Sequence, residues 1–192
     1  MATPPDFTAG SVLTAAQMNA VGLWLLETKT LTASAGPIQF DNKFTTDYDT
    51  YFLTGHWLQN TSTGVYRFQL QDVSNAAVTG LNYDCTVGGP FYNSGVSSFA
   101  NFNTQLAADH IFVGGSVAAD YFSFAMWIQR PRDAVKTTGF NQFSADNYNA
   151  TLTNVFVQGG FVHTLATAYY GCRINISAGT VTGKVSLYGY NS

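Results

Sequence analysis

The sequence predicts an all-β protein, an antiparallel β-sandwich or jelly roll with a short N-terminal helix. Apolar and polar residues alternate at period two along most of the chain after Glu27, as in residues 66–71, YRFQLQ. The alternating runs are rich in aromatic and β-branched residues, and turn-forming residues such as those at 60–64 and 88–90 bound them. No helical pattern lies between the runs, which favours antiparallel pairing over a parallel α/β arrangement.

Residues 28–192 are predicted to form one β-sandwich domain, because the same pattern continues to the end of the chain. The expected strands are Thr28–Ala33, Ile38–Asp41, Thr50–Gln59, Val65–Asp72, Gly80–Val87, His110–Gly114, Tyr121–Arg130, Lys136–Phe143, Thr151–Gly159, Ala168–Ile176 and Thr182–Tyr190. Gly88–Asn103, rich in Gly, Ser and Asn, is predicted to be a long loop. Long loops inside compact domains usually carry function.

Residues 1–27 follow a different pattern and are predicted to form an attachment segment with a short helix. Thr14 and Gln17 are spaced as a capping box, in which each side chain bonds to the other residue's backbone N–H. Such a short helix is marginal by itself, so it must pack on the protein's own body, on other copies or on a larger structure. The apolar side chains expected to make this contact are Phe7, Leu13, Met18, Val21 and Leu25.

The composition is unusually poor in charge. Charged residues make up 10% of the chain, against about 25% in average soluble domains, while hydrophobic residues make up 46%. Burial of much of the surface against other subunits would explain this composition, and so would contact with uncharged ligands such as sugars. We favour subunit contacts, because they would account for the whole chain.

Charge and hydropathy also exclude several classes of partner. The eight Lys and Arg residues form no run and the net charge is −3, which argues against binding to nucleic acid or to anionic membranes. The apolar stretch Val21–Leu26 is too short to insert into a bilayer. No basic residue precedes Lys29, so we expect no secretory signal and folding in a cytoplasm.

The chain shows no constellation typical of catalysis or of a bound cofactor. His56, His110 and His163 are far apart, so hydrogen-bonded strand histidines are more plausible than a metal on a symmetry axis or a ligand contact. Cys85 and Cys172 lie in apolar runs, which favours buried thiols over a disulfide. A Gly-x-Ser-x-Gly elbow is missing. We therefore predict that the protein is not an enzyme and holds no metal or cofactor.

Aromatic residues are the best candidates for recognition. Trp57 and Trp127 could stack on sugar rings, but each sits in an apolar strand and is expected in the core. Phe91, Tyr92 and Asn93, in the predicted loop, are better candidates for contact with a receptor.

Two segments carry a resemblance to a known group of proteins. Residues 7–19, FTAGSVLTAAQMN, resemble the N-terminal segment of many tail-fibre and minor structural proteins of tailed bacteriophages. Residues 183–190, GKVSLYGY, are similar to the last strand of small β domains in phage structural proteins, and residues 48–51 fit more loosely. The resemblance implies a virion protein, often trimeric, that forms a fibre, a receptor-binding tip or a capsid-surface appendage. It carries over no catalytic residue.

These observations lead to two hypotheses of different classes. In the first, the chain is a phage virion structural protein, assembled in the host cytoplasm as a homotrimer. Its N-terminal segment would contact other virion proteins and its β body would be displayed, with a host surface glycan as one candidate receptor. In the second, it is a free, monomeric carbohydrate-binding module with an exposed aromatic platform, which leaves the N-terminal helix unexplained.

Overall fold

A computed structural model describes residues 22–93, 96–148 and 152–190 of the chain. Its strands are β1 (Leu23–Ser34), β2 (Ile38–Phe40), β3 (Thr50–Thr61), β4 (Gly64–Gln71), β5 (Tyr83–Asn93), β6 (Val96–Ala108), β7 (Ile111–Ser116), β8 (Asp120–Gln129), β9 (Lys136–Asn147), β10 (Thr153–Ala166), β11 (Gly171–Ile176) and β12 (Thr180–Tyr190). Within these residues no helix is long and apolar enough to cross a membrane.

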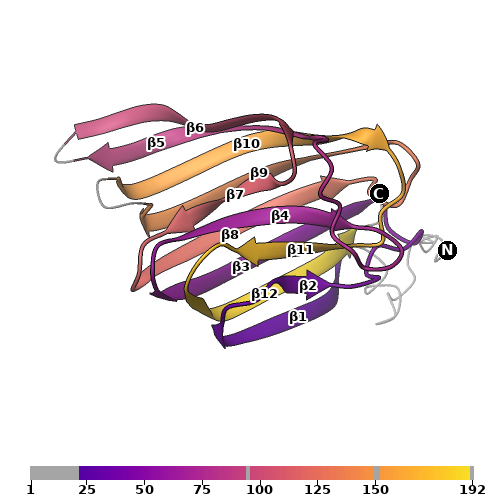
Figure 1. Ribbon diagram of the computed structural model, residues 1–192, viewed down its shortest axis with the longest axis horizontal. Coiled ribbons are helices and arrows are strands. Elements are labelled where there is room, and N and C mark those ends of the chain that lie inside the picture. The colour runs from indigo at the N-terminus through magenta and orange to yellow at the C-terminus, as the bar shows by residue number, and fades with distance from the viewer. Residues whose placement is uncertain (1–21, 94–95, 149–151, 191–192) are drawn as a thin grey trace, which may run out of the picture.

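The strands form two antiparallel sheets that pack face to face (Figure 1). The larger sheet has eight strands in the order β1-β12-β3-β8-β9-β10-β5-β6, and the smaller has four in the order β2-β11-β4-β7. Some neighbouring strands are consecutive in the chain, such as β8, β9 and β10, whereas others are far apart. The first and last described strands, β1 and β12, pair with each other. The predicted all-β antiparallel sandwich is confirmed.

Alternation along the strands builds one core between the sheets. Trp57 of β3 meets Tyr66 of β4 edge to face, with ring centroids 4.7 Å apart. Phe112 of β7 meets Phe143 of β9 in the same way at 5.9 Å. Both pairs join the larger sheet to the smaller one, and all four side chains are buried. Edge-to-face pairs of this kind add stability beyond the area they bury.

The last part of the predicted helical segment is a strand. Leu25 lies in β1 opposite Tyr188 of β12, so the helical prediction is wrong for Leu23–Leu26. Four consecutive apolar residues fit either periodicity, and here the free edge of β12 supplies ladder partners that an isolated helical turn lacks. Leu26 packs against the core, while the side chain of Leu25 is 58% exposed. Residues 1–21, with Phe7, Leu13, Thr14, Gln17, Met18 and Val21, lie outside the described residues.

The predicted loop Gly88–Asn103 is also β-structure. β5 continues through Asn93, and β6 begins at Val96 and pairs antiparallel with it. Its Gly-, Ser- and Asn-rich composition is typical of a loop, but β10 and β6 flank β5 on both sides and supply ladder partners for its backbone. Strand pairing thus overrides local propensity at this end of the sandwich.

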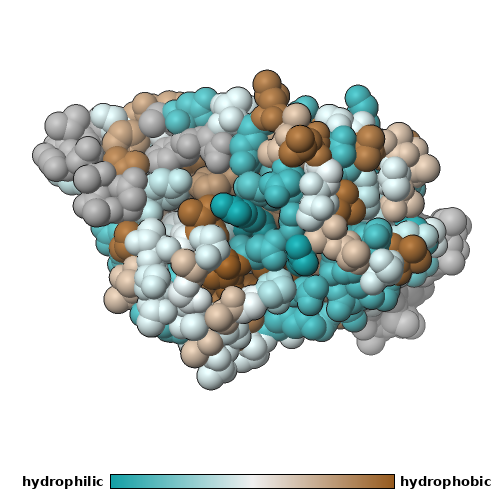
Figure 2. Space-filling model, in the orientation of Figure 1, coloured by the Kyte–Doolittle hydropathy of each residue, from teal (hydrophilic) through white to brown (hydrophobic). Residues whose placement is uncertain are grey.

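The outward face of the smaller sheet is polar. Gln69 of β4 accepts hydrogen bonds through Oε1 from Arg173 and Asn175 of β11, at 2.9 Å from Arg173 Nη2 and 2.6 Å from Asn175 Nδ2. Figure 2 shows hydrophilic residues across the middle of the molecule, where Figure 1 places β4 and β11. Apolar candidates for recognition must therefore be sought on the larger sheet.

Candidate functional site

The face of the larger sheet that points away from the smaller sheet, here called the outer face, carries an apolar band. One cross-strand row, here called the aromatic row, consists of Leu25 of β1, Tyr188 of β12, Phe52 of β3, Trp127 of β8 and Phe140 of β9. The rings of Phe52 and Trp127 lie 4.4 Å apart. Trp127 is therefore a partly exposed member of this row, and its predicted core position is wrong, whereas that of Trp57, 1% exposed, is confirmed.

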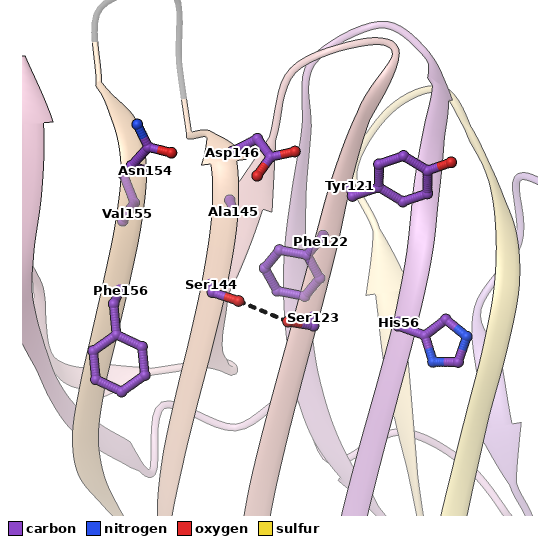
Figure 3. A pocket seen from close by; sticks show the side chains of 10 residues that line it. All are labelled: His56, Tyr121, Phe122, Ser123, Ser144, Ala145, Asp146, Asn154, Val155 and Phe156. Atoms are coloured by element: carbon purple, nitrogen blue, oxygen red, sulfur yellow. Dashed lines mark hydrogen bonds between the residues drawn. The ribbon is translucent and has the colours of Figure 1, made fainter.

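Beside the aromatic row the outer face is hollowed. A depression of about 380 Å³, here called the outer groove, lies over β3, β8, β9 and β10. It is lined by His56, Tyr121, Phe122, Ser123, Ser144, Ala145, Asp146, Asn154, Val155 and Phe156 (Figure 3). Its volume falls within the range of small-molecule and sugar sites.

The floor of the outer groove is polar. Ser123 of β8 and Ser144 of β9 are cross-strand neighbours, and their hydroxyl oxygens lie 2.7 Å apart in a hydrogen bond. His56 stands next to Ser123 in the ladder and Phe156 next to Ser144. These four residues form one row across the sheet, with an imidazole at one end and a phenyl ring at the other.

Two exposed aromatic side chains flank this floor. Tyr121 is 64% exposed and Phe156 is 44% exposed. In Figure 3, Phe156 lies on one side of the serine pair, while Tyr121 and His56 lie on the other. Asp146 stands at one end of the groove, between Tyr121 and Asn154. The arrangement places apolar rings beside uncharged hydroxyls and one carboxyl group.

A local irregularity in β10 shapes the same end of the groove. Asn154 has a φ of 48°, in the left-handed region that non-glycine residues rarely adopt. The register between β10 and β5 shifts between Thr153 and Gln158, so this part of β10 bulges. Bulges commonly redirect side chains beside binding sites, and Asn154 is exposed here.

Asn154, in the bulge, also lines a depression beside Tyr92, one of the receptor-contact candidates from the sequence. A second depression, of about 340 Å³, is lined by Pro90, Phe91, Tyr92 and Asn154. Tyr92 is 42% exposed, and its backbone oxygen accepts a hydrogen bond from Thr153 Oγ1 at 3.1 Å. Phe91 instead packs partly against the core. Asn93 ends β5, and its side chain lies outside the described residues.

The three histidines have separate environments. His56 is exposed in the outer groove. His110 lies between β6 and β7, where its Nδ1 contacts Asp109 and holds the pKa of that carboxyl below its usual value. His163 is fully buried in the core. In the described part of the chain, no three His, Cys, Asp or Glu side chains gather closely enough to hold a metal ion.

Sequence reasoning missed the outer groove as a unit, although a signal was present. Tyr121 and Phe156 are aromatic residues at positions of their strands that face away from the core. Tyr121 alternates with the buried Phe122, and Phe156 lies between the buried Val155 and Val157. Alternation along a strand places these two aromatic residues at outward-facing positions, so the sequence alone could have indicated that they are exposed.

Comparison with known proteins gives no relative: no family model matches the chain, and neither a curated protein nor a solved structure matches it significantly.

Proposed function

We propose that this protein is a structural subunit of a tailed-phage virion, a short fibre, receptor-binding or capsid-surface appendage that assembles as a homotrimer. The resemblance of residues 7–19 supports the virion location and a role for the N-terminal segment in contacting other virion proteins. The observation that carries the structural role is the open edge of the larger sheet at β6.

Natural proteins usually protect exposed sheet edges with charges, prolines or very short strands. β6 ends the larger sheet, is 13 residues long, and contains no Asp, Glu, Lys, Arg or Pro. Phe99 and Leu106 on this strand are 76% and 77% exposed, and hydrophobic residues project along the upper edge in Figure 2, near β6. A long, uncharged and apolar edge is suited to pairing with another chain.

The first part of the opposite edge, which precedes the paired charges Glu27 and Lys29 of β1, is a suitable partner. β1 is 12 residues long and exposes Leu23 and Leu25 on the outer face, at one end of the aromatic row. In a closed trimer each contact joins two different patches of the chain. β6 of one copy against β1 of the next would satisfy this rule and would cover the exposed apolar residues of both edges.

Light scattering of the purified chain tests the proposal. A trimer of 20.7 kDa chains has a mass of roughly 62 kDa. Phe99→Lys with Leu106→Lys on β6, and separately Leu25→Lys on β1, should each give monomers. Gln158→Lys on β10 and Gln129→Lys on β8 place the same charge at exposed positions on strands inside the sheet, so they are the matched controls and should leave the trimer intact.

The outcomes separate the alternatives. A monomeric wild-type chain would contradict self-association, and a dimer that only the β6 variant disrupts would replace the trimer with a two-fold β6–β6 pairing.

A further inference from the structure

We infer that the outer groove is a binding site for a neutral oligosaccharide. The inference deepens the proposed function, because it names the class of receptor that a displayed appendage would contact. It is carried by the combination of exposed rings, hydroxyl floor and single carboxyl group in one groove.

The rings provide the apolar part of the site. Tyr121 lies on β8 and Phe156 on β10, and these strands are two strand spacings, about 10 Å, apart in the sheet. Both rings are exposed on the outer face, so their apolar surface is available to a ligand. The C–H faces of a pyranose ring are apolar and flat, so they can pack on such rings while the hydroxyl groups remain free.

The floor supplies hydrogen bonds to those hydroxyl groups. Each serine hydroxyl has one donor and two acceptor positions, so the bond between Ser123 and Ser144 uses one donor and one acceptor. One donor and several acceptor positions of the pair therefore remain for a ligand. His56, exposed beside Ser123, adds a ring nitrogen at the same level.

Asp146 and Asn154 select what the groove accepts. A carboxylate accepts hydrogen bonds through two oxygens, which matches two neighbouring sugar hydroxyls, while the Asn154 carboxamide both donates and accepts. The charge of Asp146 repels an acidic sugar. Among the described residues that line the groove none is Lys or Arg, so nothing there would neutralise a phosphate, sulfate or uronate.

The shape favours a chain of sugars over a single small molecule. A further depression of about 270 Å³ shares His56, Ser123, Ser144 and Phe156 with the outer groove and extends it toward Thr54 and Gln142. At the other end, Asn154 is shared with the depression beside Tyr92. The hollows follow one another across the outer face and remain open to solvent, as an extended ligand requires.

The test measures binding of the purified full-length chain to defined oligosaccharides. The probes are gluco-, galacto- and manno-configured neutral hexasaccharides, with oligogalacturonate as the acidic counterpart, followed by saturation-transfer NMR and calorimetry. We expect at least one neutral hexasaccharide to bind and oligogalacturonate not to bind. Tyr121→Ala and Phe156→Ala should each weaken binding at least about tenfold.

Matched variants locate the site. Phe140→Ala removes a ring of similar exposure, 40%, from the aromatic row outside the groove and should leave affinity unchanged. Asp146→Asn should admit oligogalacturonate. The inference is overturned if no neutral probe binds at millimolar concentration, or if Tyr121→Ala and Phe156→Ala bind as the wild type does.

The result can be distinguished from failure of the proposed function. If the protein is a trimer but binds no probe, the saccharide site is contradicted and the structural role is not. If the protein is a monomer and its sugar binding depends on Tyr121, the trimer is contradicted and the saccharide site is not.

Discussion

The Tyr169 hydroxyl lies 2.8 Å from Nδ1 of His163, and both side chains are buried in the core. The ring of Tyr83 packs edge-on against the imidazole, with centroids 4.4 Å apart. His163 Nε2 has no hydrogen-bond partner among the described residues, and neither has Thr137 Oγ1, from the residue opposite His163 on β9. These surroundings therefore favour the neutral form of the His163 imidazole over the protonated form.

This pocket predicts a stability that depends on pH. Burial lowers the pKa of His163 below its ordinary value of 6.5, so the unfolded chain binds the proton more tightly than the folded one. The contribution of His163 is complete above pH 6.5 and is lost as pH falls from there toward the depressed pKa. Urea unfolding at pH 7.5 and at pH 5 should show a lower free energy of unfolding at pH 5.

Two substitutions test whether His163 is the source of this pH dependence. His163→Gln should reduce the difference between the two pH values, whereas His56→Gln, at an exposed position, should preserve it. An equal pH dependence in His163→Gln and in the wild type would rule out His163 as its source.

A second prediction concerns Gln59, which is fully buried in β3. Its Nε2 donates to the backbone oxygens of Thr61 and Ala178, at 2.8 and 3.0 Å, and lies 3.0 Å from that of Ser62. Its Oε1 accepts from the Tyr66 hydroxyl at 2.7 Å. Gln59→Leu removes the donor that these backbone oxygens share, while the Tyr66 hydroxyl keeps its hydrogen bond to Ser116. The loss of these buried hydrogen bonds should lower the free energy of unfolding by about 2–4 kcal/mol.

The exposed Gln158 provides the control for this substitution. Gln158→Leu makes the same chemical change on β10 and should alter the free energy of unfolding by less than about 0.5 kcal/mol in urea titrations. Similar losses in the two variants would mean that the Gln59 hydrogen bonds contribute no specific stability.

A third prediction is steric. A Cβ at Gly139 would lie 2.1 Å from the backbone oxygen of Trp127 and 2.3 Å from Phe161 Cζ, so Gly139→Ala must displace a strand. We expect a loss of about 2–3 kcal/mol. Gly160, on the neighbouring strand, meets nothing closer than 3.7 Å, and Gly160→Ala should stay within about 1 kcal/mol of the wild type. Thermal melts of the two variants make the comparison, and equal melting temperatures would refute it.

A fourth prediction concerns the thiols. Cys85 and Cys172 are both buried and unpaired, which confirms the sequence-based interpretation. Burial raises the pKa of both thiols and suppresses the reactive thiolate. A thiol reagent should therefore label neither residue in the folded protein and both in urea. Rapid labelling under native conditions, or oxidised cysteines in the intact protein, would contradict the buried placement.

A fifth prediction tests the attachment role of the N-terminal segment. β1 begins at Leu23, so deletion of residues 1–21 leaves every described strand whole, whereas deletion through Leu26 would cut into β1. The shorter deletion should preserve the far-UV β-sheet spectrum and the melting temperature. It should abolish incorporation into particles, measured by mass spectrometry of purified virions. Normal incorporation of the truncated chain would remove the segment from the attachment mechanism.

Local residue patterns were enough to locate most of the strands. Alternation such as that of residues 66–71 is a local property, because successive side chains of a strand point to opposite faces whatever their partners are. The same local information failed for Gly88–Asn103 and for Leu23–Leu26, where pairing with distant strands decided the conformation.

Strand pairing and sheet packing set which face each side chain occupies and which residues come into contact. Trp57 and Trp127 both lie in apolar strands, yet register places one in the core and the other on the outer face. The outer groove combines residues from His56 to Phe156, which four strands bring together through ladder contacts of long sequence separation. Such contacts depend on the order of strands in the sheet, which periodicity along one strand does not encode.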